Sequence, residues 1–145
     1  MRGRARVAET GTGAGVGAAW IVSALDPSVP FFTAETDAGR AAAAADLFAD
    51  DPNVSVLHGD WHDALPEHAP FDLLFHDGSK RRPDLDGEDT LRLLAPRGLV
   101  VLDDLTPGRP GPDEVREFWL RHPELAATEL RVSDREAVIV AVRTR

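Results

Sequence analysis

A run of alternating glycines is the feature of this sequence that most directly suggests chemistry. Gly11, Gly13 and Gly15 follow a short apolar segment and precede a segment with helical spacing. Glycines at such a turn let the backbone approach a ligand closely, and the first N–H groups of the following helix point at that ligand. Glu35 comes about 20 residues after the last of them, at the distance expected of a carboxylate that binds a ribose. The sequence therefore predicts a site for a nucleoside cofactor.

Acidic residues follow each of the five apolar segments that could form the parallel strands of one sheet. They are Glu9, Glu35 with Asp37, Asp60, Asp77, and the pair Asp103 and Asp104. Taken singly, each is as readily explained as a turn former or a helix cap. Gathered at one edge of a sheet, like charges repel one another unless a cation joins them. We expect a sulfonium or ammonium ligand, a divalent metal ion, or both.

The segments that must position these residues alternate between strand and helix. Strands are predicted at residues 4–9, 29–34, 54–57, 71–76, 98–102, 128–132 and 137–142. Helices are predicted at residues 16–25, 38–49, 85–94 and 113–121, with a short turn near residues 63–66. Short apolar strands joined by helices indicate an α/β fold with a mostly parallel sheet flanked by helices. Only residues 133–136 separate the last two strands, which predicts a C-terminal hairpin and an antiparallel strand at one edge.

The composition of the chain limits the classes of protein to which it can belong. The chain has 145 residues, enough for one domain, and it contains no cysteine, which excludes disulfides and thiolate metal sites. Its net charge of −9 and its lack of tyrosine argue against binding of nucleic acid, which favours a basic surface with stacking aromatic rings. No apolar run approaches the roughly 20 residues of a membrane span. We predict a single domain over residues 1–145, in the cytoplasm, with no nucleic-acid or membrane partner.

Several motifs resemble those of a known enzyme family. Residues 9–15, 31–37 and 56–61 resemble the first three motifs of the class I S-adenosylmethionine-dependent methyltransferases, which have a Rossmann-like, seven-stranded sheet. FDLLFHDGSK at residues 71–80 and GLVVLDDLTPG at residues 98–108 resemble, more specifically, the metal-dependent small-molecule O-methyltransferases, of which catechol O-methyltransferase is the familiar member. The resemblance extends from about residue 6 to residue 142, nearly the whole chain.

The resemblance implies a binding site for the cofactor S-adenosylmethionine. Its expected residues are Glu9, Gly11, Gly13, Gly15, Glu35, Asp60 and Trp61. The three glycines would admit the methionine and the ribose, and Glu9 would face the methionine ammonium group. Glu35 would accept both ribose hydroxyls, and Asp60 would receive the adenine amino group. Trp61 would form the floor of the adenine pocket or pack in the core.

The resemblance also implies a metal site and a catalytic base. Asp77 and Asp103 would bind Mg²⁺, or Mn²⁺ or Ca²⁺ in its place, since hard cations prefer oxygen ligands. Asp104 would join them, although it stands where the family usually has asparagine. Lys80, three residues after Asp77, would act with it in catalysis as the base. The histidines form no spaced ligand set and are expected to be structural, with His76 as a candidate for the wall of the substrate cleft.

These residues together predict an enzyme, an S-adenosylmethionine-dependent O-methyltransferase assisted by a divalent metal. Its substrate would be a small hydroxylated molecule, catechol-like or a natural product. An NAD(P)-dependent oxidoreductase is an alternative, because Gly13, Gly15 and Ala18 also satisfy the dinucleotide-binding pattern. That alternative gives no role to Asp77 and Asp103 together.

A second alternative is a catalytically silent binding subunit with a methyltransferase fold. Typical members of the family carry helices before the first strand, and these helices cover the cofactor. This sequence begins almost at that strand, so we expect the helical lid to be missing and the cofactor affinity of the isolated chain to be low. The sequence leaves a homodimer open as a partner.

Overall fold

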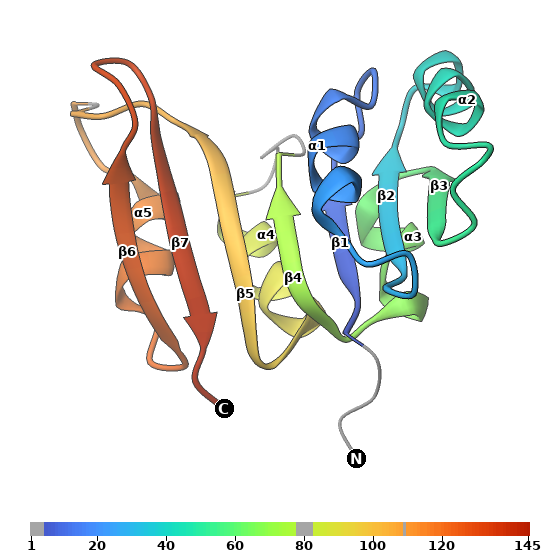
Figure 1. Cartoon of the computed structure of the whole chain (residues 1–145). Helices are drawn as coiled ribbons and strands as arrows, with labels where there is room; N and C mark the ends of the chain where they lie inside the picture. The colour runs from blue at the N-terminus through green and yellow to red at the C-terminus, as the bar shows by residue number, and fades with distance from the viewer. Residues whose placement is uncertain (1–4, 78–82, 109) are drawn as a thin grey trace.

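The computed structural model describes residues 5–77, 83–108 and 110–145, and in these residues the chain forms a seven-stranded sheet (Figure 1). The strands are β1 (Val7–Thr10), β2 (Phe31–Glu35), β3 (Val54–His58), β4 (Phe71–His76), β5 (Leu94–Leu105), β6 (Leu125–Arg131) and β7 (Ala137–Arg143). Their order in the sheet is β3-β2-β1-β4-β5-β7-β6. Strands β1 to β5 are parallel, and β7 is antiparallel to both of its neighbours. The predicted Rossmann-like fold with a C-terminal hairpin is confirmed, with the antiparallel strand β7 lying one place inside the edge strand β6.

Helices cover both faces of the sheet. The helices are α1 (Val16–Ala24), α2 (Ala38–Leu47), α3 (Trp61–Ala64), α4 (Pro83–Leu93) and α5 (Glu114–Arg121), with a 3-10 turn, η1 (Pro66–His68), after α3. In Figure 1, α1 and α2 lie in front of the sheet, whereas α3, α4 and α5 lie behind it. Aspartates cap three of these helices with their side chains, because each accepts a hydrogen bond from an N–H that has no partner within the helix.

The period-two pattern of the strands divides the core between these two layers. Val7 and Phe31 pack with Ala18 and Phe48 beneath α1 and α2. The next residue of β1, Ala8, points to the opposite face and joins a larger cluster beneath α3, α4 and α5. Both faces of the central strands are therefore buried, as expected of a parallel sheet covered by helices.

Some predicted boundaries are wrong. Strand β5 runs from Leu94 to Leu105, well beyond the predicted 98–102, and Leu94 belongs to this strand and not to the preceding helix. Strand β6 begins at Leu125 instead of residue 128, and the predicted turn at 63–66 is the end of α3 and the start of η1. A buried leucine fits either periodicity, so the sequence alone could not divide α4 from β5.

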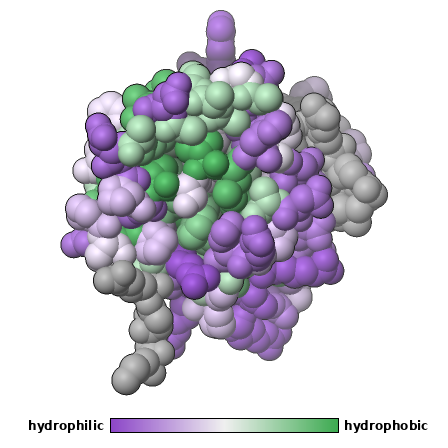
Figure 2. All heavy atoms as spheres, turned by 90° about the vertical axis from the view of Figure 1, so that its right-hand side faces the viewer, coloured by the Kyte–Doolittle hydropathy of each residue, from purple (hydrophilic) through white to green (hydrophobic). Residues whose placement is uncertain are grey.

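One side of the molecule exposes apolar side chains. Val16 and Trp20 of α1 and Leu47 at the end of α2 are 68%, 77% and 56% exposed. They line a shallow groove of about 380 Å³ between the two helices. Figure 2, which looks from the side of α2 and β3, shows apolar surface surrounded by hydrophilic residues. Among the described residues, no helix has the length and apolar character needed to span a membrane.

Candidate functional site

Strands β1 to β5 end at the same edge of the sheet, as their parallel register requires. Glu35 pairs with His58 at the ends of β2 and β3, and Thr10 pairs with His76 at the ends of β1 and β4. Leu102 of β5 lies next to His76 in the same register. The acidic residues predicted to close these strands therefore lie along one edge, where open α/β sheets bind their ligands.

The glycine loop between β1 and α1 is held by Glu35. The N–H of Gly13 donates to Glu35 Oε2 at 2.8 Å, and the N–H of Asp37 donates to Glu35 Oε1 at 2.9 Å. Gly13 has a φ of +55°, which disfavours other residues, and a Cβ placed on it would meet no atom within 4 Å. Glu35 thus lies directly beside an open stretch of glycine backbone. That arrangement suits a ribose that bridges the loop and the carboxylate.

Gly15, in contrast, is packed against the side chains of α2. A Cβ at this residue would lie 3.0 Å from Leu47 Cδ2, so Gly15 lets the loop pack against α2. The N–H of Gly11 donates to the carbonyl of Ala34 at 2.9 Å and continues the pairing of β1 with β2. Gly13, unlike Gly15, therefore borders open space.

Glu9 is buried at the end of β1, with 1% of its surface exposed. Its Oε2 accepts a hydrogen bond of 2.7 Å from the Thr33 hydroxyl, and its Oε1 would lie 2.6 Å from a Cβ on Gly17 of α1. Burial raises the pKa of Glu9 from its ordinary value of 4.5 to about 7, the Thr33 hydrogen bond opposes this, and the negative charge of Asp77 adds to it. Glu9, the predicted partner of the methionine ammonium group, is therefore a buried carboxyl group beneath the glycine loop.

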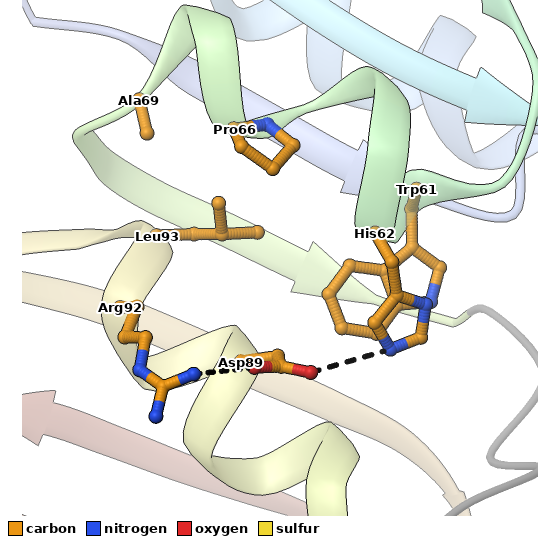
Figure 3. A pocket seen from close by; sticks show the side chains of 7 residues that line it. All are labelled: Trp61, His62, Pro66, Ala69, Asp89, Arg92 and Leu93. Atoms are coloured by element: carbon orange, nitrogen blue, oxygen red, sulfur yellow. Dashed lines mark hydrogen bonds and ion pairs between the residues drawn. The ribbon is translucent and has the colours of Figure 1, made fainter.

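Asp60 and Trp61 lie where β3 passes into α3, and His62 joins them. Asp60 Oδ1 accepts hydrogen bonds from the N–H of His62 at 3.0 Å and lies 2.7 Å from His62 Nδ1. The Trp61 ring is 6% exposed, belongs to the core and stacks on the His62 ring at 3.6 Å between centroids. Figure 3 shows these two rings beside a cavity of about 260 Å³ that Asp89 of α4 also lines.

His76 does not line an open cleft. It is 2% exposed, its Nδ1 lies 2.8 Å from the Thr10 hydroxyl, and its ring meets the Trp61 ring edge-on at 5.4 Å. The ring faces the core, which agrees with the structural role expected of the histidines and not with the candidate role in the cleft wall. Its contacts with Thr10 and Trp61 instead fix the end of β4, directly before Asp77.

The predicted metal ligands lie on neighbouring strands. Asp77 follows His76 at the exposed end of β4, and its N–H donates to the carbonyl of Thr10 at 3.2 Å. Asp103 is half-buried in β5, where the pairing with β7 is irregular between Leu102 and Leu105. Such a bulge can redirect side chains next to an active site.

The rest of that predicted site falls outside the described residues. Lys80 lies there, and so does the side chain of Asp104. Within the part of the chain that is described, no group of three or more histidine, cysteine, aspartate or glutamate side chains could hold a metal ion. A three-carboxylate site therefore depends on Asp104.

Sequence reasoning missed the threonines and His62. Thr33 donates to Glu9, and its hydroxyl also lies 2.6 Å from that of Thr12 in the glycine loop. His62 contacts Asp86, which is 24 residues away along the chain. The alternation of β2, which places Thr33 on the same face as Phe31, could have indicated the first contact. No sequence signal indicates the second.

This sheet order, with a glycine loop after β1 and an acid at the end of β2, defines the architecture of the class I S-adenosylmethionine-dependent methyltransferases. A family model described as a methyltransferase domain matches residues 8–105. The chain belongs to this methyltransferase domain family. Comparison with curated proteins finds no match.

Solved structures agree with this assignment. The O-methyltransferase TomG from Streptomyces achromogenes, involved in tomaymycin synthesis and solved with S-adenosylmethionine, is 25% identical, with a TM-score of 0.78 over 97% of this chain and 73% of that chain. An O-methyltransferase from Bacillus cereus in complex with S-adenosylhomocysteine is 23% identical, with a TM-score of 0.79 over 95% and 73%. A methyltransferase from Geobacter sulfurreducens is 21% identical, with a TM-score of 0.79 over 97% and 71%. The resemblance to O-methyltransferases that the motifs suggested is confirmed, and the last two likenesses show the shared fold.

Proposed function

We propose that this protein transfers the methyl group of S-adenosylmethionine to a hydroxyl group of a small molecule, with help from a divalent metal ion. The observation that carries the proposal is the contact between Glu35 and the glycine loop, which sets a buried carboxylate beside open backbone at Gly13. Family membership and the O-methyltransferases among similar structures support the reaction type. They also favour it over an NAD(P)-dependent oxidoreductase.

The cofactor would lie along the ends of β1, β2 and β3. Glu35 would accept hydrogen bonds from the ribose hydroxyls, and the glycine backbone at Gly11, Gly13 and Gly15 would admit the methionine and ribose portions. Asp60 receives the adenine amino group. Glu9 lies beneath the loop near the methionine ammonium group, so a positive charge there would favour its ionised form.

The acceptor would lie beyond the ends of β4 and β5. Methyl transfer to oxygen needs an ionised hydroxyl, and a phenol with a pKa near 10 costs about 4 kcal/mol to ionise at pH 7. Asp77 and Asp103, with Asp104, offer the hard oxygen ligands that Mg²⁺ or Mn²⁺ prefers, and zinc is disfavoured. When bound, such an ion supplies positive charge that makes the hydroxyl more acidic. Lys80 would take the hydroxyl proton on its neutral amine, the form that a neighbouring cation favours.

The experiment compares two variants with the parent protein. Calorimetry measures S-adenosylhomocysteine binding, and turnover of S-adenosylmethionine is followed with a catechol, with Mg²⁺ or with a chelator. Asp77→Asn is expected to bind the cofactor product as the parent does and to lose the stimulation by Mg²⁺. Glu35→Gln is expected to lose about 10- to 100-fold in binding affinity, the value of one or two hydrogen bonds to a charged group.

Each other outcome removes a part of the proposal. If Asp77→Asn has the turnover and chelator sensitivity of the parent, the metal assignment fails. Binding of S-adenosylhomocysteine without turnover of any hydroxylated acceptor indicates a silent binding subunit. Binding of NAD(P) in its place indicates an oxidoreductase.

A further inference from the structure

Three consecutive residues of β2 hold the glycine loop that follows β1. The carbonyl of Ala34 accepts a hydrogen bond of 3.2 Å from the N–H of Thr12. On one side of this contact, the hydroxyls of Thr33 and Thr12 lie 2.6 Å apart, and on the other, Glu35 accepts from the N–H of Gly13. Of these three contacts, the one between the threonines is the contact that uses a side chain of the loop.

Thr33 extends this contact to Glu9, beneath the loop. Its hydroxyl donates to Glu9 Oε2 at 2.7 Å. A hydroxyl carries one proton, so the Thr12 hydroxyl is the donor in the bond between the two threonines. Thr12, Thr33 and Glu9 are 3%, 0% and 1% exposed, so water does not compete for these bonds. A buried chain of two hydrogen bonds therefore runs from the loop through β2 to the end of β1.

The glycine loop needs such an anchor because its backbone is intrinsically free. Gly11 and Gly13 have φ values of +83° and +55°, and Thr12 is the residue between them. Glycine loses more conformational freedom than any other residue when its backbone is fixed. A contact that fixes the loop before the cofactor arrives removes this entropic cost from the binding step.

We propose that Thr33 is a positioning residue, whose hydroxyl holds the glycine loop in its cofactor-binding conformation by joining Thr12 to Glu9. The inference rests on the proposed function, in which this loop admits the methionine and ribose portions of the cofactor. Thr33 acts through the loop and takes no part in methyl transfer. Once the cofactor is bound, its own contacts hold the loop. Loss of the Thr33 hydroxyl therefore raises the KM for S-adenosylmethionine more than it lowers kcat.

Two variants separate the hydroxyl of Thr33 from the rest of its side chain. Thr33→Val replaces the hydroxyl by a methyl group, whereas Thr33→Ser keeps the hydroxyl and lacks the methyl group. In calorimetry, Thr33→Val should raise the dissociation constant for S-adenosylhomocysteine about fivefold, the value of one neutral hydrogen bond. Thr33→Ser should bind S-adenosylhomocysteine nearly as the parent does.

Thr90→Val is the matched control. Thr90 is also 0% exposed, and its hydroxyl donates to the carbonyl of Asp86 within α4, away from the glycine loop. This variant should lose stability in urea unfolding, as Thr33→Val does, but keep the affinity of the parent. The comparison separates loss of the loop anchor from a general loss of stability.

Thr12→Val breaks the same chain from the loop side and leaves the bond between Thr33 and Glu9 in place. It should also raise the dissociation constant about fivefold. Because the two threonines act through one contact, the double variant of Thr12→Val and Thr33→Val should show about the same fivefold rise. Independent effects would multiply to about 25-fold. Should Thr33→Val fail to fold, Thr12→Val decides the test by itself.

Amide hydrogen exchange measured by NMR tests the anchor without any turnover. In the free protein, the N–H groups of Thr12 and Gly13 should exchange faster in Thr33→Val than in the parent, and the difference should disappear when S-adenosylhomocysteine is bound. Equal exchange in the two free proteins overturns the inference.

Four binding and kinetic results also overturn it. They are parent-like affinity in Thr33→Val, equal weakening in Thr33→Ser and Thr33→Val, multiplied effects in the double variant, and a fall in kcat at constant KM. A parent protein that fails to bind S-adenosylhomocysteine overturns the proposed function itself. The exchange comparison of the free proteins still tests the loop anchor in that case, which separates the two failures.

Discussion

Replacing Glu9 by glutamine should change how the stability of this protein depends on pH. Glu9 is 1% exposed, and its pKa rises from 4.5 to about 7, chiefly because burial disfavours the charged carboxylate. Below pH 4.5 the group is protonated in both the folded and the unfolded chain. Between 4.5 and about 7 the unfolded chain loses this proton first, so the free energy of unfolding falls as the pH rises.

The magnitude follows from the same two pKa values. At about 1.4 kcal/mol for each pKa unit, the change from 4.5 to about 7 corresponds to about 3 kcal/mol of stability, lost in full above the higher value. Glu9→Gln cannot ionise, so it should not show this loss. Its amide oxygen can still accept the hydrogen bond from the Thr33 hydroxyl.

The assay is urea unfolding followed by tryptophan fluorescence, for parent and variant, at several pH values from about 4 to about 8. The quantity to compare is the difference in free energy of unfolding between the two proteins, because other titrating groups contribute equally to both. This difference should move by about 3 kcal/mol in favour of the variant as the pH rises. Glu67→Gln, with 77% of the side chain exposed, is the matched control and should follow the parent. Parallel curves for the parent and Glu9→Gln would refute the reasoning.

Three further substitutions test the packing around the site. Gly87→Ala places a Cβ 2.6 Å from the Phe118 ring, so overpacking should cost about 1–3 kcal/mol of stability, more than the roughly 1 kcal/mol gained in helix propensity. Denaturant unfolding of the double variant with Phe118→Leu should show that the smaller side chain relieves this loss. Arg116→Lys should lower the free energy of unfolding by about 1–3 kcal/mol, since lysine cannot replace the two-nitrogen contact with Glu129; an unchanged unfolding midpoint would contradict this. Gly13→Ala should cost about 1–2 kcal/mol of stability, from a positive φ with no steric clash, and should weaken cofactor binding measured by calorimetry; unaltered values of both would place the ligand elsewhere.

The succession along the chain of the first five strands and the helices between them could be predicted because it depends on local patterns. Each apolar segment has the length and β-branched or aromatic content of a strand, and each is followed by helix-forming residues. Strand β4 has the predicted bounds, Phe71–His76, since a proline precedes it and an acid follows it. The position of β7 between β5 and β6 could not be read in the same way, because a hairpin is compatible with either strand at the edge.

The candidate site likewise contains some contacts that local sequence predicts and others that it does not. The spacing between Gly15 and Glu35 predicts a carboxylate near the glycine loop, and the structure places Glu35 there, in contact with Gly13. The partners of Glu9 and His62 come from other elements, Thr33 on β2 and Asp86 on α4, and depend on how those elements pack. Local sequence carries no record of the His62–Asp86 contact, and only the alternation of β2 indicates the contact between Thr33 and Glu9. The effect of burial on the pKa of Glu9 is equally a property of the packed structure.

A crystal structure of this protein with S-adenosylhomocysteine tests the central claim most directly. The account predicts ribose hydroxyls within hydrogen-bonding distance of the Glu35 carboxylate, and the sugar seated against the open backbone of Gly13. A nucleoside bound elsewhere, with Glu35 making no contact to the ribose, would contradict it.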